Sequence, residues 1–183
     1  MDRRASLPTS NIDIQTVNYF DDYDFNRDGS ADYVFNTTGM PCLQFAIYDL
    51  DGSPIYPTCI PSANTPSYRT RGLMTGSKIK VLDLTNTVQW INSANFFDDY
   101  SRVIQTQSND FLGGSDLFNL TYDFLGRLTY SHLKHTEPNA TVTTILNSYQ
   151  YDKMSRLIQV NQKNNNDEPI SLAKRTYNEL GQI

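Results

Sequence analysis

The chain has 183 residues, of which 38% are hydrophobic and 12% are aromatic, with 12 Tyr and 9 Phe. This length accommodates one domain with its own core, and large flat side chains favour β-strands over disorder. The net charge is −5 and the 15 Lys and Arg residues are scattered, so no nucleic-acid surface is expected. No apolar run is long enough for a membrane span, and residues 1–8 lack the apolar core of a signal peptide.

The first predicted segments are a flexible tail over residues 1–16 and a β-rich module over residues 17–60. The tail is polar and has no hydrophobic periodicity. The module is dense in Tyr, Phe and Asp, and we expect order to begin near Val17. It contains two features of chemical interest, an Asp-rich loop and a pair of cysteines.

The Asp-rich loop begins at Asp24 and reaches its twelfth position at Phe35. Oxygen-bearing side chains occupy its first, third, fifth and ninth positions and Gly29 occupies the sixth, which is the spacing by which an EF-hand-type loop wraps Ca²⁺. The candidate ligands are Asp24, Asn26, Asp28, Ser30 through its carbonyl, and Asp32. Position twelve lacks the usual bidentate Glu, and no helical pattern flanks the loop.

Two interpretations of this loop remain open. One is a helix-free Ca²⁺ loop, in which the cation offsets the repulsion among three converging carboxylates. The other is an Asx-rich turn between two strands, for which Asp, Asn and Gly are the ordinary residues. Calcium would raise the melting temperature of the protein in the first case and not in the second.

Cys42 and Cys59 are the only cysteines, and they flank a turn signal at residues 49–53. A hairpin centred on this turn would place the two cysteines opposite each other, close enough for a disulfide in an oxidising compartment. A pair of buried free thiols is the equally open alternative.

Beyond the cysteines, residues 61–72 predict a coil linker and residues 73–183 predict an array of β-hairpins. The linker is rich in Ser and Pro. Residues 78–82 alternate as a half-exposed strand, and residues 87–97 form a second strand that leads into the array. One continuous sheet is the simplest arrangement of these strands.

Four copies of a seven-residue pattern organise the array. Each copy has an aromatic residue, Asp or Asn, two variable residues, Gly or Ser, Arg or Gln, and an aliphatic residue. Copies that recur every 25 to 29 residues are typical of repeat proteins. The predicted turn residues are Phe97, Asp98, Arg102, Tyr122, Asp123, Gly126, Arg127, Tyr151, Asp152, Arg156, Tyr177, Asn178 and Gly181.

The pattern has the residue preferences of a type I turn with a bulge, which closes a β-hairpin. The Asp side chain caps backbone N–H groups, and Gly takes the positive-φ position. Arg is expected to fold back toward the Asp or the turn carbonyls, while the aromatic and aliphatic residues meet across the strand pair. At Ser101 and Ser155 the same conformation would cost roughly 1 kcal/mol, so those turns are either strained or of another type.

The segments between the turns predict the fold. It is all-β, an antiparallel meander of β-hairpins that forms a curved strip of sheet with little helix. One edge of the sheet should carry the four similar turns. The other edge should carry dissimilar polar loops at residues 110–116, 137–140 and 164–169.

No group of residues in the sequence predicts catalysis. His132 and His135 are the only histidines, and residues three apart on a strand face opposite sides, so they cannot share a metal. Both are expected at the surface. No nucleophile motif accompanies them, and we expect that the chain is not an enzyme.

The copies at residues 122–128 and 151–157 resemble the YD repeats of bacterial RHS proteins. Residues 97–114 and 21–29 are also similar to that family, and the resemblance extends over residues 17–183. It implies a sheet strip that spirals into a hollow shell around a C-terminal toxin or another cargo, or that acts at the cell surface. The implied partners are the rest of the shell and its cargo, and the implied location is secreted or cell-surface.

The chain also departs from a complete member of that family. Four turn units are too few to close a cage, and the family's Asp-Pro-x-Gly-type self-cleavage motif is absent. The function we expect is therefore that of a structural, non-catalytic fragment of such a shell. The alternative is a free-standing β-rich module that binds carbohydrate or protein through aromatic side chains.

Overall fold

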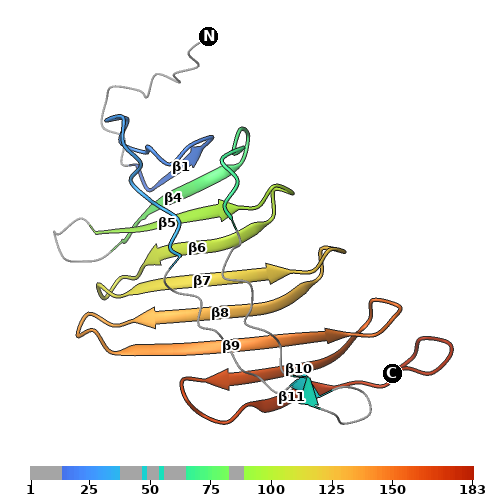
Figure 1. Ribbon diagram of the computed structural model, residues 1–183. Helices are drawn as coiled ribbons and strands as arrows, with labels where there is room; N and C mark the ends of the chain where they lie inside the picture. The colour runs from blue at the N-terminus through green and yellow to red at the C-terminus, as the bar shows by residue number, and fades with distance from the viewer. Residues whose placement is uncertain (1–13, 38–46, 49–53, 56–64, 83–88) are drawn as a thin grey trace.

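The computed structural model describes residues 14–37, 47–48, 54–55, 65–82 and 89–183, and every regular element in this part of the chain is a β-strand. Nine strands form one open antiparallel sheet in the order β1-β4-β5-β6-β7-β8-β9-β10-β11 (Figure 1). Their bounds are β1 Thr16–Phe20, β4 Met74–Lys80, β5 Trp90–Phe97, β6 Val103–Asn109, β7 Ser115–Tyr122, β8 Leu128–Thr136, β9 Val142–Tyr151, β10 Leu157–Asn164 and β11 Ile170–Lys174. The predicted all-β meander is confirmed.

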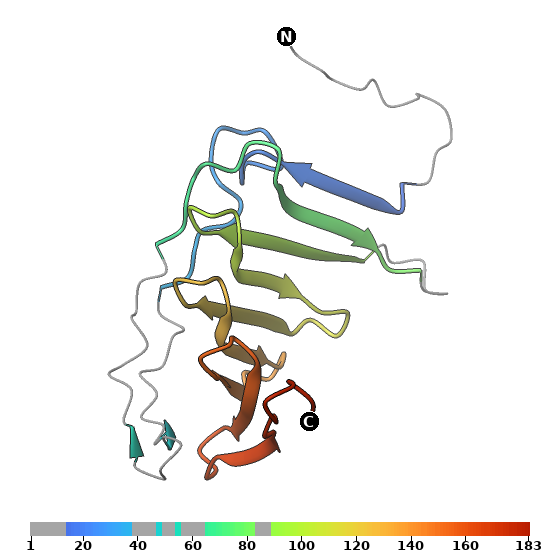
Figure 2. The same cartoon turned by 90° about the vertical axis from the view of Figure 1, so that its right-hand side faces the viewer.

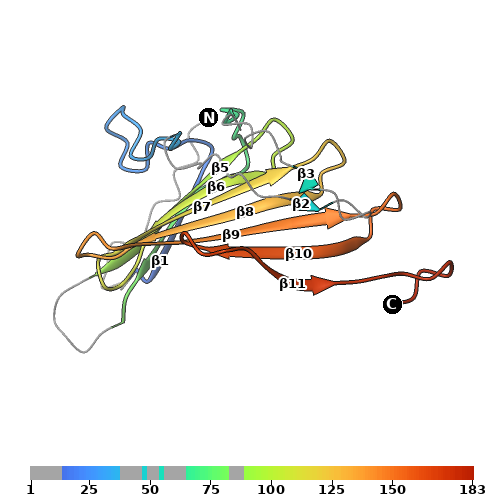
Figure 3. The same ribbon diagram turned by 60° about the horizontal axis from the view of Figure 1, so that its bottom comes forward.

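The sheet is twisted and ends in two edge strands, β1 and β11. Figures 2 and 3 show the strand direction turning steadily from one edge to the other, as the chirality of extended L-residues requires. Consecutive strands from β4 to β11 are neighbours in the sheet, and their connections alternate between the two ends of the strands. The sheet therefore grows by one hairpin at a time.

The first strand belongs to the same sheet as the repeats, so the sheet continues across the predicted linker. Thr16 in β1 lies opposite Ile79 in β4. After β1 the chain is fastened to the segment that precedes β4. The Thr70 hydroxyl donates to the Asp21 carbonyl, and the Gly72 amide donates to the Asp21 carboxylate over 2.6 Å. The predicted opening module and the repeat array therefore share one sheet.

A second, two-stranded sheet pairs β2 (Ile47–Tyr48) with β3 (Pro54–Ile55), with Ile47 opposite Ile55. This antiparallel pairing agrees with the turn predicted between the two strands. Cys42 and Cys59 lie outside the described residues, so their disulfide stays a prediction. Residues 1–13, most of the predicted tail, also lie outside the described part.

An aromatic core lies where the segment after β1 covers β5 and β6. Tyr23 stacks on Phe96 with ring centroids 4.6 Å apart, and its hydroxyl donates to the Asn95 carbonyl over 2.9 Å. Ala94 and Ile104 complete the buried cluster. Burial raises the pKa of Tyr23 to about 12, because the phenolate would lose its hydration there.

Gly76 in β4 permits the close approach of Phe25, which extends this core. A Cβ built on Gly76 would lie 2.4 Å from the Phe25 ring and 2.8 Å from the Ser93 carbonyl oxygen. Phe25 also stacks on Tyr19, with ring centroids 4.3 Å apart. Only glycine therefore leaves room for this ring on the sheet.

Beside the core, polar side chains cross the sheet from strand to strand. The Gln105 amide donates to the Asn119 side chain over 2.7 Å, and Asn119 lies opposite His132. His132 is only 4% exposed, and neither of its ring nitrogens has a hydrogen-bond partner in the described part of the chain. The expectation that His132 lies at the surface is wrong, because it lies in line with the buried side chains of Asn119 and Gln105 on the neighbouring strands. Burial lowers its pKa.

His135 lies on the opposite face of β8, as three-residue spacing on a strand requires. Its Nδ1 is 2.7 Å from an oxygen of Asp116 on β7, and this hydrogen bond raises the pKa of the imidazole. The two histidines therefore differ in burial, in partners and in the direction of their pKa shifts.

Candidate functional site

The repeated turn, here called the corner, is the most regular arrangement of polar groups in the described chain. In the second corner the Asp123 amide donates to the Arg127 carbonyl over 2.9 Å, and the Gly126 amide donates to the Asp123 carbonyl over 3.0 Å. One carboxylate oxygen of Asp123 accepts from the amides of Leu125 and Arg127, both at 2.9 Å. The other oxygen accepts from Nε of Arg127 at 2.6 Å. A single carboxylate thus holds both the backbone and the arginine.

The same contacts recur at Asp98 with Arg102 and at Asp152 with Arg156. The predicted fold-back of each arginine onto its own Asp is therefore confirmed. Each of these hairpins also has the predicted irregularity in register beside the turn. The side chains of Asp98, Asp123 and Asp152 are mostly shielded from solvent, so their ion pairs are screened less than pairs in open water.

The fourth corner keeps this geometry without charge. The Asn178 side-chain oxygen accepts from the amides of Leu180 and Gln182 over 3.0 and 2.9 Å. The Asn178 amide group donates to the Gln182 side-chain oxygen over 3.0 Å. Replacing Asp and Arg together by Asn and Gln keeps the hydrogen bond between the two side chains, because Asn now donates and Gln now accepts.

All four corners use the left-handed conformation at the position of Gly or Ser. The φ angles are 60° at Ser101, 80° at Gly126, 64° at Ser155 and 79° at Gly181. The two serine corners are therefore of the same type as the glycine corners, and they carry the strain that was one of the two predicted options.

Successive corners are locked to one another. The Arg102 guanidinium lies over the ring of Tyr122, 4.7 Å from its centroid, and the Tyr122 hydroxyl donates to the Val103 carbonyl over 3.0 Å. Arg127 lies over Tyr151 at 4.8 Å, and Arg156 over Tyr177 at 4.4 Å. The hydroxyls of these two tyrosines likewise donate to the carbonyls of Leu128 and Leu157. Each arginine is held between its own Asp and the next tyrosine.

The expected meeting of the aromatic and aliphatic residues of one turn is confirmed, since Tyr122 lies opposite Leu128 and Tyr151 opposite Leu157. The contact between the arginine of one corner and the tyrosine of the next was not predicted. In the sequence, the sign of this lock is that an Arg in each of the first three corners is followed by a Tyr that begins the next corner. A cation over a tyrosine ring contributes about 0.5–1 kcal/mol at an exposed site. The lock therefore stabilises the order of the hairpins as well as each turn.

Asp123 and Asp152, in the second and third corners, have pKa values below their usual range. For Asp152 the largest cause is the hydrogen bond from the Arg156 amide, with further contributions from the Arg156 side chain. Burial by itself raises the pKa of Asp123, and the hydrogen bonds and charge of Arg127 lower it by more. Burial raises the pKa of the phenol groups of Tyr122 and Tyr151.

Two turns on the opposite edge share the backbone of the corner although their sequences differ. The Asp110 amide donates to the Gly114 carbonyl over 3.0 Å, and the Glu137 amide donates to the Thr141 carbonyl over 2.8 Å. The expectation of dissimilar loops is wrong for the backbone of these two turns. Neither has an arginine that returns to its first residue, so the locked corner is confined to one edge within the described residues.

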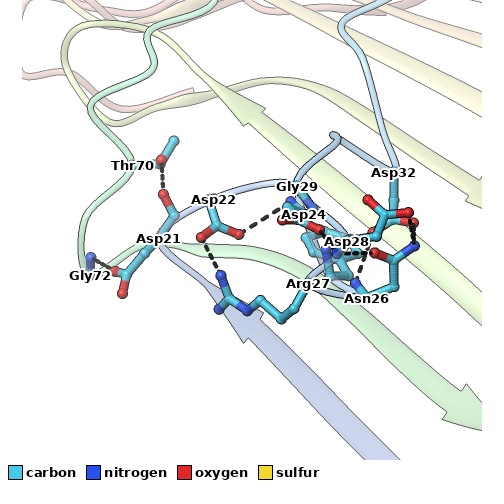
Figure 4. Close-up of polar contacts among 11 residues, drawn as sticks. Asp21, Asp22, Asp24, Asn26, Arg27, Asp28, Gly29, Asp32, Thr70 and Gly72 are labelled. Atoms are coloured by element: carbon cyan, nitrogen blue, oxygen red, sulfur yellow. Dashed lines mark hydrogen bonds and ion pairs between the residues drawn. The ribbon is translucent and has the colours of Figure 1, made fainter. Parts of the chain in front are cut away.

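The Asp-rich loop is closed by hydrogen bonds from its own amides (Figure 4). Asp24 accepts from the amides of Asp28 and Gly29 over 3.1 and 3.0 Å. Asp32 accepts from the amides of Phe25 and Asn26 over 2.6 and 3.0 Å. Asx turns, in which a side chain accepts from the amide two residues ahead, occur at Asp22, Asn26 and Asp28.

The Asn26 amide group lies between two of the candidate carboxylates. Its nitrogen donates to Asp28 over 3.2 Å and to Asp32 over 3.0 Å, so this N–H group offsets part of the repulsion between the two carboxylates. Ser30 donates to Asp28 from its amide and its hydroxyl, and these bonds lower the pKa of Asp28. No group of three or more His, Cys, Asp or Glu within the described chain converges as metal ligands. This geometry is that of an Asx-rich turn, and calcium binding stays a prediction.

One further ion pair closes the base of this loop. Arg27 donates to the Asp22 carboxylate over 2.6 Å, and hydrogen bonding to Asp22 raises the pKa of the guanidinium. Both side chains are well exposed, so the pair contributes little to stability.

The fold and the corners define an open antiparallel β-sheet built from repeated, locked hairpins. Comparisons with known protein families, with curated proteins and with solved structures found no match. Among the residues that the structure describes, no helix has the length and apolar character needed to cross a membrane.

Proposed function

We propose that this chain is a length of wall from an RHS-type YD-repeat shell, with a structural and non-catalytic role. The observation that supports the proposal is the lock between corners, in which the arginine of one corner lies on the tyrosine of the next. A contact that recurs between neighbouring units holds a repeat protein in register over any number of units. A continuous wall needs this property.

The proposed partners follow from the role of a wall. They are the neighbouring parts of the same shell and the cargo inside it, a C-terminal toxin or another variable domain. The proposed location is outside the producing cell or on its surface. Four corners span only part of a shell, so the chain would contribute one strip of the wall.

The test is the gene around this chain. We expect the open reading frame to continue past Ile183 with more copies of the corner pattern, and the product of the extended frame to form hollow particles in electron micrographs. A frame without further copies, or an extended product that forms solid particles, would contradict the proposal.

A carbohydrate- or protein-binding module is the second candidate, and one observation favours it. A hollow of about 250 Å³ at the edge opposite the corners is lined by Trp90, Asn109 and residues 110–113 among others. An indole ring beside amide and carboxylate groups suits the apolar faces and hydroxyls of a sugar. Binding on a glycan array that is lost in Trp90→Ala would support this function, and an unaltered chain that binds no glycan would exclude it for sugars.

A further inference from the structure

The fourth position of the corner pattern is apolar in every copy, although the pattern itself leaves this position variable. Its four occupants are exposed at the tips of the turns: Tyr100 by 81%, Leu125 by 56%, Met154 by 74% and Leu180 by 83%. Phe124, which precedes Leu125, is 93% exposed. The backbone amides at these positions hold the turn through hydrogen bonds that do not involve the side chains, and the Tyr100 ring also lies 5.0 Å from the guanidinium of Arg102.

These tips lie in a row along one edge of the sheet. The turns between β5 and β6, between β7 and β8 and between β9 and β10, and the turn after β11, follow one another along that edge (Figure 1). Successive tips are two strands apart, or about 10 Å. The row, here called the tip row, is thus an apolar ridge with a regular spacing. Exposed apolar side chains gathered in this way mark a surface that binds a partner.

The charged residues beside the tips restrict what that partner can be. The third position of the pattern holds Asp99, Phe124, Lys153 and Glu179 in the four corners. Asp99 and Lys153 are exposed. The first and third corners therefore carry opposite charges on either side of an apolar second corner, an arrangement that is complementary to itself when reversed.

We infer that the tip row binds the tip row of a second copy of this chain, in a two-fold arrangement centred on the second corner. Phe124 then meets Phe124 on the axis. Asp99 meets Lys153 twice, and Tyr100 meets Met154, a favourable sulfur–aromatic contact. The alternative that sets the first corner against the fourth would bring Asp99 toward Glu179, and like charges disfavour it.

The area of this contact is enough for a weak dimer. Four exposed apolar side chains, Tyr100, Phe124, Leu125 and Met154, would bury about 600 Å² per copy, or about 1,200 Å² in total, the lower limit of specific interfaces. The dimer should therefore dissociate on dilution. This inference is independent of the shell, since it needs only the 183-residue chain.

Sedimentation velocity of the whole chain over about two decades of concentration tests the inference. We expect a reversible monomer–dimer equilibrium. Lys153→Asp should raise the dimer Kd by about tenfold or more, because the substituted carboxylate would face Asp99 twice across the axis and repulsion would replace two attractive pairs. The charge-swapped double variant Asp99→Lys with Lys153→Asp should return Kd to within about threefold of the parent, since the pairs are restored in reverse.

Phe124→Ser should also weaken the dimer, whereas Leu112→Ser, which removes a similarly exposed apolar side chain at the opposite edge, should not. Circular dichroism and melting confirm that each variant is folded. The inference would be overturned if the chain were monomeric at every concentration, or if the corner variants left the dimer Kd unchanged. It would also be overturned if the double variant had a Kd as high as that of Lys153→Asp.

Discussion

At the scale of the residue, each corner depends on one side chain with two acceptor atoms or with one acceptor and one donor. Asp123 satisfies two backbone amides and one guanidinium, and Asn178 achieves the same with an amide group because Gln182 replaces the arginine. The geometry therefore requires a matched donor and acceptor rather than a charge. The charge adds a dependence on pH.

The first prediction concerns that pH dependence. Because the folded-state pKa of Asp123 is lowered, its contribution to stability is present above the unfolded-state pKa of about 3.9 and is lost as the pH falls through the folded pKa. Converting this corner to the uncharged form, Asp123→Asn with Arg127→Gln, should reduce the loss of stability between neutral pH and pH about 3. Urea unfolding at several pH values measures this loss of stability. An unchanged acid sensitivity would contradict the contribution of the ionised Asp123 to stability.

The second prediction compares two glycines that are needed for different reasons. Gly126→Ala should destabilise by about 1 kcal/mol through its positive φ, since the space around it is open apart from an ordinary contact with Arg102. Gly76→Ala should cost more, roughly 2–3 kcal/mol, because the new methyl group would overlap the Phe25 ring and the Ser93 carbonyl. Equal costs in denaturant unfolding would show that one of these causes is misassigned.

At the scale of the element, hairpins are joined by two kinds of contact. The strand ladder pairs each strand with its neighbours, and the arginine of each of the first three corners reaches the tyrosine of the next corner along the edge. The contact between arginine and tyrosine joins one hairpin to the next through side chains alone. It therefore couples the stabilities of neighbouring corners.

The third prediction measures this coupling. In a double-mutant cycle, Arg127→Ala and Tyr151→Leu should be non-additive by about 0.5–1 kcal/mol, because either change removes the same cation–π contact. The control cycle pairs Arg127→Ala with Tyr177→Leu, whose ring lies under Arg156 instead, and should be additive. Additivity in both cycles would mean that the lock contributes nothing to stability.

The fourth prediction concerns the Asp-rich loop. If this loop binds Ca²⁺, calcium should raise the melting temperature relative to chelator, and Asp28→Asn should reduce that shift. The Asn26 amide would have to leave its present position between Asp28 and Asp32 to admit the cation. Identical melts in calcium and chelator would establish the loop as an Asx-rich turn.

At the scale of the whole molecule, burial is unevenly distributed along the sheet. The aromatic core covers β5 and β6 at one end, where Ala94 and Phe96 are almost completely buried. At the other end β11 is mostly exposed, and Ile170 and Leu172 are each more than half exposed. Local stability should therefore fall from the core toward β11.

The fifth prediction is a gradient in amide hydrogen exchange. Amides of β5 and β6 should exchange slowest, near the rate set by global unfolding, and those of β11 fastest, because few apolar contacts hold that strand. Exchange followed by mass spectrometry resolves the strands. Uniform protection across the sheet would mean that it unfolds as one unit.

The sequence by itself determined the meander and its corners, because the interactions responsible are local. The Asp or Asn side chain of each corner accepts from amides two and four residues ahead, so a short pattern specifies the turn. Alternation between the turns then specifies the strands. The Asx contacts of residues 24–32 are local in the same sense.

Only the tertiary structure decided what lies across the strands and above the sheet. The lock joins residues about 20 to 24 positions apart, such as Arg127 and Tyr151, and His132 is buried in line with Asn119 on β7 and Gln105 on β6. The predicted meander already brings the fourth positions of the corners to one edge, but the exposure of their side chains is known only from the structure. A short sequence pattern specifies the hydrogen bonds between near neighbours, but burial and contacts between repeats depend on how the whole sheet folds.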